Sequence, residues 1–536
     1  MVYYSQFNTT TDHAFNVYQA IRYCREHGVD KLVFEKGVYD FYPDKASEDV
    51  MYVSNHDIYG IYRIAFLLKG MKNFTIDGGG SKFMFHDCIL PFVLKNSENI
   101  VLENFSLDYA AIPSIEAFVT RVEEDFFEMD VLGEETYRID RGQLYAQDQF
   151  GLKDYPYASI YVRGMNYDRK YLPITRDAPT WGEVVQFEDL GNRKLRMYEK
   201  SVRLEQGTNL TLRCKTTRQT CNIVISECKD ISVQNVVMHR SYGMGVLAQK
   251  TENVTIDRMT VEAREGHMDS LNADATHFVH CKGLVKVTNS SFREQLDDAL
   301  NIHGIFTKII EKTDTYILVK YMHSQAQGIN IYDKGAVFQT LNPKTLIPNG
   351  EYEIADVDVI NMNITRIYVK GGTGNIRVGD VVEDLTWSCD LLFENNKVWD
   401  NRARGMLIAS KGKTVIRNNY FNSPGVAILF ESDGQFWFES GGTNDVEILG
   451  NTFENCKFAT AWGKYVITVK PREEFNEGQF YHKFIRIAEN RFVGNKAPLL
   501  YADNIAEVVF ENNTVEDQAS EELTTFVNCG IVRCDV

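Results

Sequence analysis

The sequence has no long apolar segment. No run approaches the 18 or more consecutive apolar residues that a membrane-spanning helix needs. The first residues also lack the basic segment and the apolar core of a secretory signal. We therefore expect no membrane insertion. We expect a secreted or periplasmic protein whose signal segment is absent from this chain, with a cytoplasmic protein as the alternative.

Paired cysteines and positive charge are also scarce. The ten cysteines are scattered without a C-x-x-C pair, so neither a zinc site nor a small disulfide scaffold is indicated, and their disulfide state stays open. The chain has 57 Lys and Arg against 74 Asp and Glu, a net charge of −17. Such a surface repels nucleic acids, anionic membranes and polyuronates. The charge therefore favours a neutral sugar or a glycan end as partner, and it leaves the oligomeric state open, with a homodimer as one alternative.

What the sequence does contain is a repeat of short strand-like segments. At 536 residues the chain exceeds one ordinary core, a limit that does not apply to a solenoid because each repeat contacts only its neighbours. In the last five repeats an Asn stands two residues before a Phe or Val. These pairs are Asn396 and Val398, Asn419 and Phe421, Asn451 and Phe453, Asn490 and Phe492, and Asn513 and Val515. Constant strands with loops of varying length are typical of stacked coils, and Asn suits the turns because it tolerates left-handed backbone and its amide can bond along a ladder. The predicted fold is all-β, a right-handed parallel β-helix.

Two stretches interrupt the repeat. Both contain alternating strand-like segments and turn residues without the Asn punctuation, so we predict two small antiparallel β-barrel domains inserted into loops of the β-helix. A short helix that follows Asp12 and ends at Gly28 would cover the open N-terminal end of the solenoid. The predicted organisation is a cap with the first coils (1–109), a first inserted barrel (110–220), central coils (221–305), a second inserted barrel (306–387) and C-terminal coils (388–536).

Three aspartates in the central coils are the candidate catalytic residues. Asp274 lies 23 residues before Asp297, which is followed directly by Asp298. This is about one coil of a solenoid, so the three carboxylates are expected to stack on one face. Hydrolysis of a glycosidic bond needs one carboxyl to protonate the leaving oxygen and another, ionised, to activate water or attack carbon. Like charges held close together separate the pKa values in the way this chemistry requires. An isolated Asp pair is ordinarily a turn or a helix cap, but the coil spacing favours catalysis.

Five motifs together resemble one known family. They are DFYPDKASED followed by SNHD, TIDGGGSKFMFH, GMGVLAQ, NADATHF and DDALNIHG. Through them the sequence resembles glycoside hydrolase family 110 over nearly its whole length, including both predicted insertions. The resemblance implies an exo-acting α-1,3-galactosidase that acts on the non-reducing terminal galactose of blood-group B and linear α-galactosyl glycans. It also implies a β-helix with two inserted barrels, inversion at the anomeric carbon, and neither a metal nor an organic cofactor.

The acids are also arranged as in polygalacturonases, which have an Asp one coil before an Asp pair that a His-Gly follows. That similarity implies Asp297 as the general acid and Asp274 with Asp298 as the base for water. The spacing itself leaves the stereochemistry open, because coils lie about 4.8 Å apart, whereas inverting carboxyls usually stand about 6.5–9.5 Å apart and retaining ones about 5 Å. Neighbouring strand residues face opposite sides, so Asp297 and Asp298 reach one ligand only across a bend.

Several polar and aromatic residues near the acids or in a long later loop are candidates for substrate binding. They are His303, Asn301, His277, Arg264, Glu265, Trp437 and Glu439. His303 would bond a sugar hydroxyl or one of the acids, and a plain turn histidine is the alternative. Trp437 would stack on a sugar face, since an aromatic ring offers apolar area with a polar edge, and packing under its own loop is the alternative.

Two other functions compete with the galactosidase prediction. A polygalacturonase-like hydrolase or a pectate lyase would use the same fold, but a lyase needs a basic proton acceptor and usually calcium, and a uronate binder needs basic subsites. Leu296 and Ala299 flank the Asp pair, and the chain is strongly acidic, which counts against both. A non-catalytic glycan-binding β-helix is the third alternative, and it would not need three clustered acids. Fold alone does not choose among them.

Overall fold

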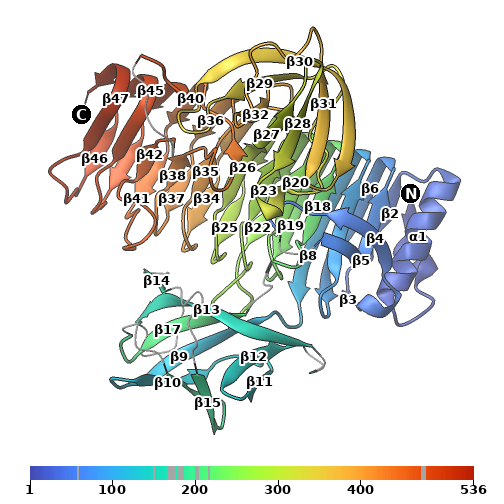
Figure 1. The fold of residues 1–536 in the computed structure, drawn as a ribbon. Helices are drawn as coiled ribbons and strands as arrows, with labels where there is room; N and C mark the ends of the chain where they lie inside the picture. Colours follow the sequence, from blue (N-terminus) through green and yellow to red (C-terminus); the bar gives the residue numbers. More distant parts are fainter. Residues whose placement is uncertain are drawn as a thin grey trace.

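The computed structural model describes residues 1–56, 59–148, 151, 153–165, 176–178, 186–198, 204–214, 218–471 and 478–535. In these residues the main body is a β-helix, whose 32 strands form one continuous sheet system. Figure 1 shows the coils stacked from one end of the molecule to the other, and successive coils of the central part pair in parallel. The predicted fold class is confirmed.

The coils build three parallel sheets, which we number in the order in which the chain passes through them. The first sheet contains β5 (Tyr59–Lys69), β7 (Leu90–Lys95), β18 (Ile223–Ser226), β20 (Val246–Gln249), β23 (Thr276–Val279), β26 (Leu300–Ile305), β35 (Met406–Ile408), β38 (Ile428–Phe430) and β42 (Ile467–Val469). The second contains β21 (Glu252–Asp257), β24 (Lys282–Thr288), β33 (Cys389–Glu394), β36 (Lys413–Arg417), β40 (Asp445–Leu449) and β43 (His482–Ala488). The third contains β22 (Thr260–Val261), β25 (Ser291–Arg293), β34 (Lys397–Trp399), β37 (Tyr420–Asn422), β41 (Thr452–Glu454), β44 (Arg491–Val493) and β46 (Thr514–Glu516).

Some longer strands belong to two of the three sheets within one coil. The second and third sheets share β6 (Lys72–Phe85), β8 (Glu98–Tyr109) and β19 (Lys229–Met238), and the first and second share β45 (Leu500–Glu511) and β47 (Thr524–Cys534). Inside the coils, equivalent apolar side chains stack on one another from coil to coil. The rings of Phe421 and Phe453 lie 5.1 Å apart and nearly parallel, and Phe492 continues the stack at 4.9 Å. The predicted Phe and Val positions therefore form the core.

A helix covers the N-terminal end of the β-helix, as predicted. In front of α1 (His13–His27) the Asp12 carboxylate accepts the backbone N–H groups of Ala14 at 3.0 Å and Phe15 at 3.4 Å, and Gly28 ends the helix with a φ of 62°. The buried side of α1 contacts β5. The other elements at this end are β1 (Val2–Tyr3), η1 (Tyr4–Phe7), β2 (Lys31–Val33), β3 (Val38–Phe41), η2 (Pro43–Lys45) and β4 (Ser47–Tyr52).

The repeated asparagines form a buried ladder at the turn between the second and third sheets. Each backbone N–H bonds to the side-chain oxygen of the next Asn along, from Asn396 to Asn419 at 2.8 Å and from Asn419 to Asn451 at 2.9 Å. The left-handed backbone is found one residue earlier, at Asn395 and Asn418, both with a φ of 57°. The ladder asparagines are therefore selected for hydrogen bonding, whereas their neighbours make the turn.

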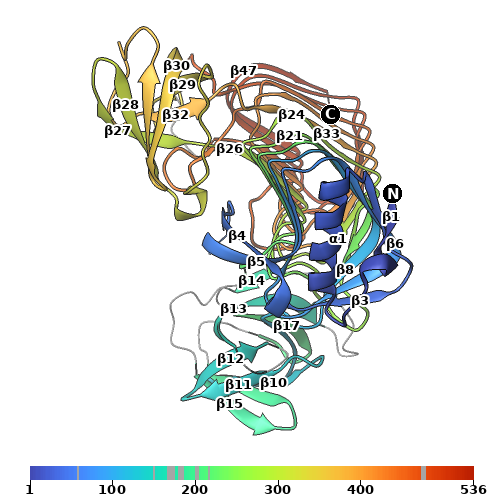
Figure 2. The same ribbon diagram turned by 90° about the vertical axis from the view of Figure 1, so that its right-hand side faces the viewer.

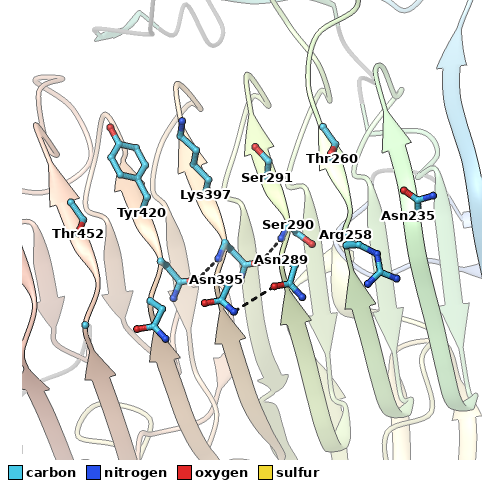
Figure 3. Close-up of a pocket in the computed structure, with 14 residues that line it drawn as sticks. Asn235, Arg258, Thr260, Asn289, Ser290, Ser291, Asn395, Lys397, Tyr420 and Thr452 are labelled. Carbon is cyan, nitrogen blue, oxygen red and sulfur yellow. Dashed lines mark hydrogen bonds between the residues drawn. The ribbon is translucent and has the colours of Figure 1, made fainter.

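Figure 3 shows the outer side of these turns, where Asn395 donates to Asn289 at 3.4 Å. An open groove of about 620 Å³ follows the turns from Asn235 to Thr452. The groove lies between the second and third sheets. It is therefore on a different side of the β-helix from the turn that carries the candidate acids, which precedes the first sheet.

The first insertion leaves the chain after β8 and returns before β18. Its strands are β9 (Ser114–Val122), β10 (Phe126–Val131), β11 (Tyr137–Asp140), β12 (Gln143–Gln147), β13 (Asp154–Met165), β14 (Arg176–Ala178), β15 (Gln186–Gly191), β16 (Lys194–Tyr198) and β17 (Thr208–Cys214). They pair antiparallel in one sheet, and the two ends of its main path meet where the Phe187 N–H donates to the Gly142 carbonyl at 2.8 Å. The described part of this insertion is therefore a strongly curved, barrel-like sheet.

The second insertion leaves after β26 and returns before β33. It is a closed barrel of β27 (Thr307–Lys312), β28 (Tyr316–Tyr321), β29 (Val337–Leu341), β30 (Pro348–Asn361), β31 (Ile364–Val369) and β32 (Val381–Asp384), with η3 (Ser324–Ala326) in a connection. One insertion thus precedes the first sheet and the other follows it. Figure 2 shows them projecting from the β-helix in different directions, the first at the bottom of the view and the second at the upper left. No helix in the described ranges has the length and apolar character needed to cross a membrane.

Candidate active site

The three aspartates lie together at the N-terminal edge of the first sheet. The pairing of Thr276 with Leu300 places Asp274 directly beside Asp298 in the next coil, and the Asp298 N–H donates to Asp274 Oδ1 at 3.1 Å. The Asp pair stands in a bend before β26, which lets the neighbouring side chains reach one site. One carboxylate oxygen from each of the three acids lies within 4.8 Å of the others. The structure therefore brings together the three residues that the sequence singled out.

Arginines surround the acids on the exposed side. Arg218 Nη2 lies 2.7 Å from Asp297 Oδ2, and Arg402 Nη1 lies 3.9 Å from Asp297 Oδ1. Arg404 holds Asp298 in a fork, with Nη2 at 2.9 Å from Oδ2, while Nε and the backbone N–H donate to Oδ1 at 3.1 Å. Such bidentate contacts fix both the charge and the orientation of a carboxylate.

Burial and charge separate the pKa values of the three acids. Burial, reinforced by the charge of Asp297, raises the pKa of Asp274 to about 7. Burial also raises the pKa of Asp298 to about 8, since the charges of the two other acids add to it and Arg404 only partly offsets them. Burial acts on Asp297 too, but Arg218, Arg402 and Arg404 outweigh it and hold its pKa below the usual value. Near neutral pH the pair of Asp274 and Asp298 therefore retains a proton while Asp297 is ionised.

Two predicted histidines continue from Asp274 along the outer face of the first sheet. His277 Nδ1 lies 2.9 Å from Asp274 Oδ2, and His277 Nε2 lies 3.0 Å from His303 Nε2. Asn301 aligns with His277 in the next coil, and its side-chain oxygen has no hydrogen-bond partner within the described ranges. The Asn301 oxygen is therefore a buried acceptor next to His277.

Glu439 reaches the same face from the later loop. It belongs to β39 (Glu439–Ser440), which pairs antiparallel with the end of β26 and places Glu439 Oε1 3.6 Å from His303 Nε2. The loop before it is fixed by Asp433, which accepts the backbone N–H groups of Gln435, Phe436 and Trp437, each at 2.8 Å. Trp437 is 40% exposed as a residue, and the centroid of its ring lies 4.9 Å from that of His323 in the second insertion. One part of this ring packs and another part faces solvent.

Arg264 and Glu265 lie elsewhere. Arg264 Nη1 is 3.3 Å from Asp108 Oδ2, in a buried ionic network at the base of the first insertion, and Glu265 is exposed in the adjacent turn. In the same network Arg240 Nη1 donates to Glu135 of the insertion at 3.0 Å. Within the described residues no contact joins Arg264 or Glu265 to the acids. The geometry gives these two predicted substrate ligands no support and assigns Arg264 to holding the insertion in place.

Known proteins resemble this chain over nearly its whole length. α-1,3-Galactosidase B of Bacteroides fragilis is 32% identical over 529 residues, which cover 92% of this chain and 86% of that protein. α-1,3-Galactosidase B of Parabacteroides distasonis is 31% identical over 531 residues, covering 92% and 83%. The chain belongs to the family of these α-1,3-galactosidases. α-1,3-Galactosidase A of Shewanella woodyi is 28% identical over 531 residues, covering 93% and 82%.

The profile of one known family agrees with the β-helix. A family profile described as a right handed beta helix region matches residues 346–534 of this α-1,3-galactosidase family member. Among solved structures, the Agl-KA catalytic domain aligns with 100% of this chain and 68% of its own, at a TM-score of 0.45 and 10% identity. The relatives named α-1,3-galactosidase are glycoside hydrolases, so the predicted enzyme class is confirmed.

The spacing of the acids in this family member also suits a cation. One oxygen from each acid is near enough to the others to hold a metal ion. However, Arg218 and Arg404 already contact Asp297 and Asp298 and supply positive charge there. The donor set therefore fits an acid-base site in which guanidinium groups balance the carboxylates.

The arginines are residues of the candidate site that the sequence reasoning missed. Arg404 lies 106 residues after Asp298, yet the pairing of Leu300 with Met406 makes it the next residue in the same stack. Aligning DNRARG at 400–405 with the coil that contains the Asp pair would have revealed it. Arg218 gave no such signal, because it comes from the end of the first insertion and only tertiary folding brings it to Asp297.

Proposed function

We propose that the protein is an exo-acting α-1,3-galactosidase of glycoside hydrolase family 110, which removes terminal α-1,3-linked galactose with inversion at the anomeric carbon. The observation that carries this proposal is the cluster of Asp274, Asp297 and Asp298, with oxygens within 4.8 Å of one another and pKa values driven apart. Glycoside hydrolysis requires carboxyl groups in both protonation states at one site. The relatives named α-1,3-galactosidase supply the substrate class.

The position of the acids supports action on a chain end. The Asp297 side chain is 15% exposed, whereas that of Asp298 is fully buried. Arg213 of the first insertion donates to the Asn272 carbonyl at 3.1 Å, beside the acids, and β39 and the second insertion adjoin the other end of β26. Little of the cluster is therefore exposed. Such a site suits one terminal sugar better than a polymer that passes through.

The protonation states of the three acids indicate a catalytic role for each. The protons held by the buried pair and the ionised Asp297 give the site donors and an acceptor near neutral pH. Asp297 is the most exposed of the three and is placed to meet the substrate. If Asp297 is the general acid, as similarity to polygalacturonases implies, it has to take the proton of the neighbouring pair when Arg218 is displaced by substrate.

One observation favours the alternative of a uronate-cleaving enzyme. Arg218, Arg402 and Arg404 are basic groups at the acids, which the sequence reasoning did not expect. Each of them contacts a carboxyl group of Asp297 or Asp298, so none is left without a partner from the protein itself. A neutral sugar therefore fits the site without leaving a charge unpaired.

A substrate panel tests the proposal. The purified protein is incubated with Galα1-3Gal, the blood-group B trisaccharide, p-nitrophenyl α-galactoside and polygalacturonate. Free galactose from the α-1,3-linked substrates is the expected product, and the ratio of the first two rates measures the preference for linear or branched glycans. An Asp298→Asn variant serves as the inactive control. Release of uronic acid, or galactose release that the variant retains, contradicts the proposal.

A further inference from the structure

Four ionisable side chains form a continuous chain that leads away from the acid cluster. Asp274 Oδ2 lies 2.9 Å from His277 Nδ1, His277 Nε2 lies 3.0 Å from His303 Nε2, and His303 Nε2 lies 3.6 Å from Glu439 Oε1. The first three side chains are almost completely buried, and that of Glu439 is 16% exposed. The chain therefore joins the acids to a more accessible carboxylate.

A backbone carbonyl fixes the direction of the hydrogen bonds in this chain. His303 Nδ1 lies 2.7 Å from the carbonyl oxygen of Gly304, which only accepts, so His303 Nδ1 carries a proton. In a neutral His303 ring Nε2 is then an acceptor, and His277 has to donate from its own Nε2. A neutral His277 ring consequently accepts at Nδ1, and Asp274 has to donate as a carboxylic acid. Burial and the neighbouring His303 lower the pKa of His277 well below its usual value, in agreement with a neutral ring.

A second arrangement has the same number of protons. The proton on Asp274 Oδ2 moves to His277 Nδ1, and the proton on His277 Nε2 moves to His303 Nε2. Asp274 becomes a carboxylate, His277 stays neutral in its other tautomer, and His303 becomes an imidazolium 3.6 Å from Glu439. Both arrangements satisfy the hydrogen bonds between Asp274 and His277 and between His277 and His303, and only the second places a charged His303 beside Glu439. The chain is therefore a two-state element.

We propose that Asp274, His277, His303 and Glu439 form a proton relay that switches Asp274 between a protonated resting form and an ionised form that accepts a proton from the attacking water. The relay rests on the proposed hydrolase function. During hydrolysis Asp298, which like Asp274 is protonated in the resting form, gives its proton to the leaving oxygen, directly or through Asp297, and Asp274 takes one from water. Asp274 then passes that proton to the depleted neighbour, so the cluster returns to its starting state with His303 still charged. The reverse transfer along the relay restores the resting form.

The relay assigns His277, His303 and Glu439 to positioning a proton, where the sequence predicted sugar ligands. The charged groups that face the two histidines are Asp274, Asp297, Arg218 and Glu439, and His280 lies close to His303. Among these, Glu439 stabilises the His303 imidazolium and Arg218 opposes positive charge on His277. Removing the charge of Glu439 is therefore the most selective perturbation.

Kinetics of Glu439→Gln and His277→Asn separate a relay from sugar binding. With a blocked relay, Asp274 has to lose its proton to solvent, so kcat should fall about tenfold on the acid side and recover at alkaline pH. This moves the acidic limb of the kcat profile upward by about one pH unit, while KM stays within about twofold. Glu447→Gln is the matched control, since Glu447 lies on the second sheet, 3.4 Å from Lys413 and outside the site. A raised KM with an unshifted kcat profile overturns the relay.

Nitrogen-15 NMR of the histidine rings tests the relay without substrate. In the ligand-free protein at neutral pH, His303 should carry its proton on Nδ1 and His277 on Nε2, with His277→Asn and His303→Asn assigning the signals. A proton on His277 Nδ1 next to a neutral His303 overturns the relay. If the tautomers match and no galactoside is cleaved, the proposed function fails while the proton arrangement stands.

Discussion

Replacing Asn419 by alanine is expected to loosen the β-helix at one defined turn. The Asn419 side chain is buried and makes three hydrogen bonds. Its Oδ1 accepts the backbone N–H of Asn396 at 2.8 Å, and its Nδ2 donates to the Phe393 carbonyl and to Asn451 Oδ1, both at 2.9 Å. Alanine removes all three hydrogen bonds.

The size of the effect follows from the groups left behind. Alanine leaves the N–H of Asn396 without its acceptor and the carbonyl of Phe393 without its donor. Each buried polar group that loses its partner costs about 1–3 kcal/mol, so the free energy of unfolding should fall by about 2–6 kcal/mol. Asn419→Asp keeps the acceptor but turns an oxygen toward two other oxygens, so it should be no more stable than the alanine variant. Asn418→Ala is the matched control, because Asn418 is exposed and contributes mainly its left-handed backbone.

Hydrogen exchange and urea unfolding measure this prediction. In Asn419→Ala the backbone amide of Asn396 should exchange faster, and the urea midpoint should fall with an unchanged slope. Asn418→Ala should shift the midpoint much less. Unchanged protection at Asn396, or equal destabilisation by the two variants, would refute the reasoning that the inner ladder and not the turn residue stabilises the coil.

Further predictions concern the acids. Asp297→Asn should lower turnover of Galα1-3Gal by about 10²–10⁴-fold with little change in melting temperature. If Asp297 is the acid, turnover of p-nitrophenyl α-galactoside should fall much less, because its leaving group needs no proton. Near-normal turnover of the disaccharide would exclude Asp297 from catalysis. Proton NMR during hydrolysis should show β-galactose first, and α-galactose first would mean retention. Activity should survive EDTA, whereas loss that calcium restores would point to a metal-assisted reaction. Because folding raises the pKa of Asp274 to about 7 and that of Asp298 to about 8, the folded chain binds protons more tightly than the unfolded chain, so their contribution to stability should decline from about pH 4 to about pH 8. Urea midpoints across this range should fall more steeply for the wild type than for Asp274→Asn, and parallel slopes would contradict the raised pKa values.

The first insertion links fold and site in a way that the sequence did not predict. Its Glu135 bonds to Arg240 of the β-helix, while its Arg213 contacts the carbonyl of Asn272, beside the acids. The buried ionic network that includes Arg264 therefore anchors the insertion whose end carries Arg218 to Asp297. Arg264 was predicted as a sugar ligand, but within the 14-residue connection between β22 and β23 it lies against Asp108 and not beside Asp274.

The sequence by itself determined the fold class and the meeting of the three acids. Both follow from a local period, because a residue one coil later in the chain stands beside its predecessor whatever the rest of the molecule does. That rule places Asp298 beside Asp274 and builds the ladder through Asn396 and Asn419. Counting residues is sufficient for contacts of this kind.

Only the tertiary structure decided the protonation of the site. The arginines come from an insertion or from beyond one, and the loop that ends in Glu439 reaches His303 through an antiparallel pair that no repeat predicts. A pKa depends on burial and on every nearby charge, and these distances are set by how insertions and long loops pack on the coils. Counting residues along the chain was therefore enough to predict which acids meet, whereas the distribution of protons among them required the assembled structure.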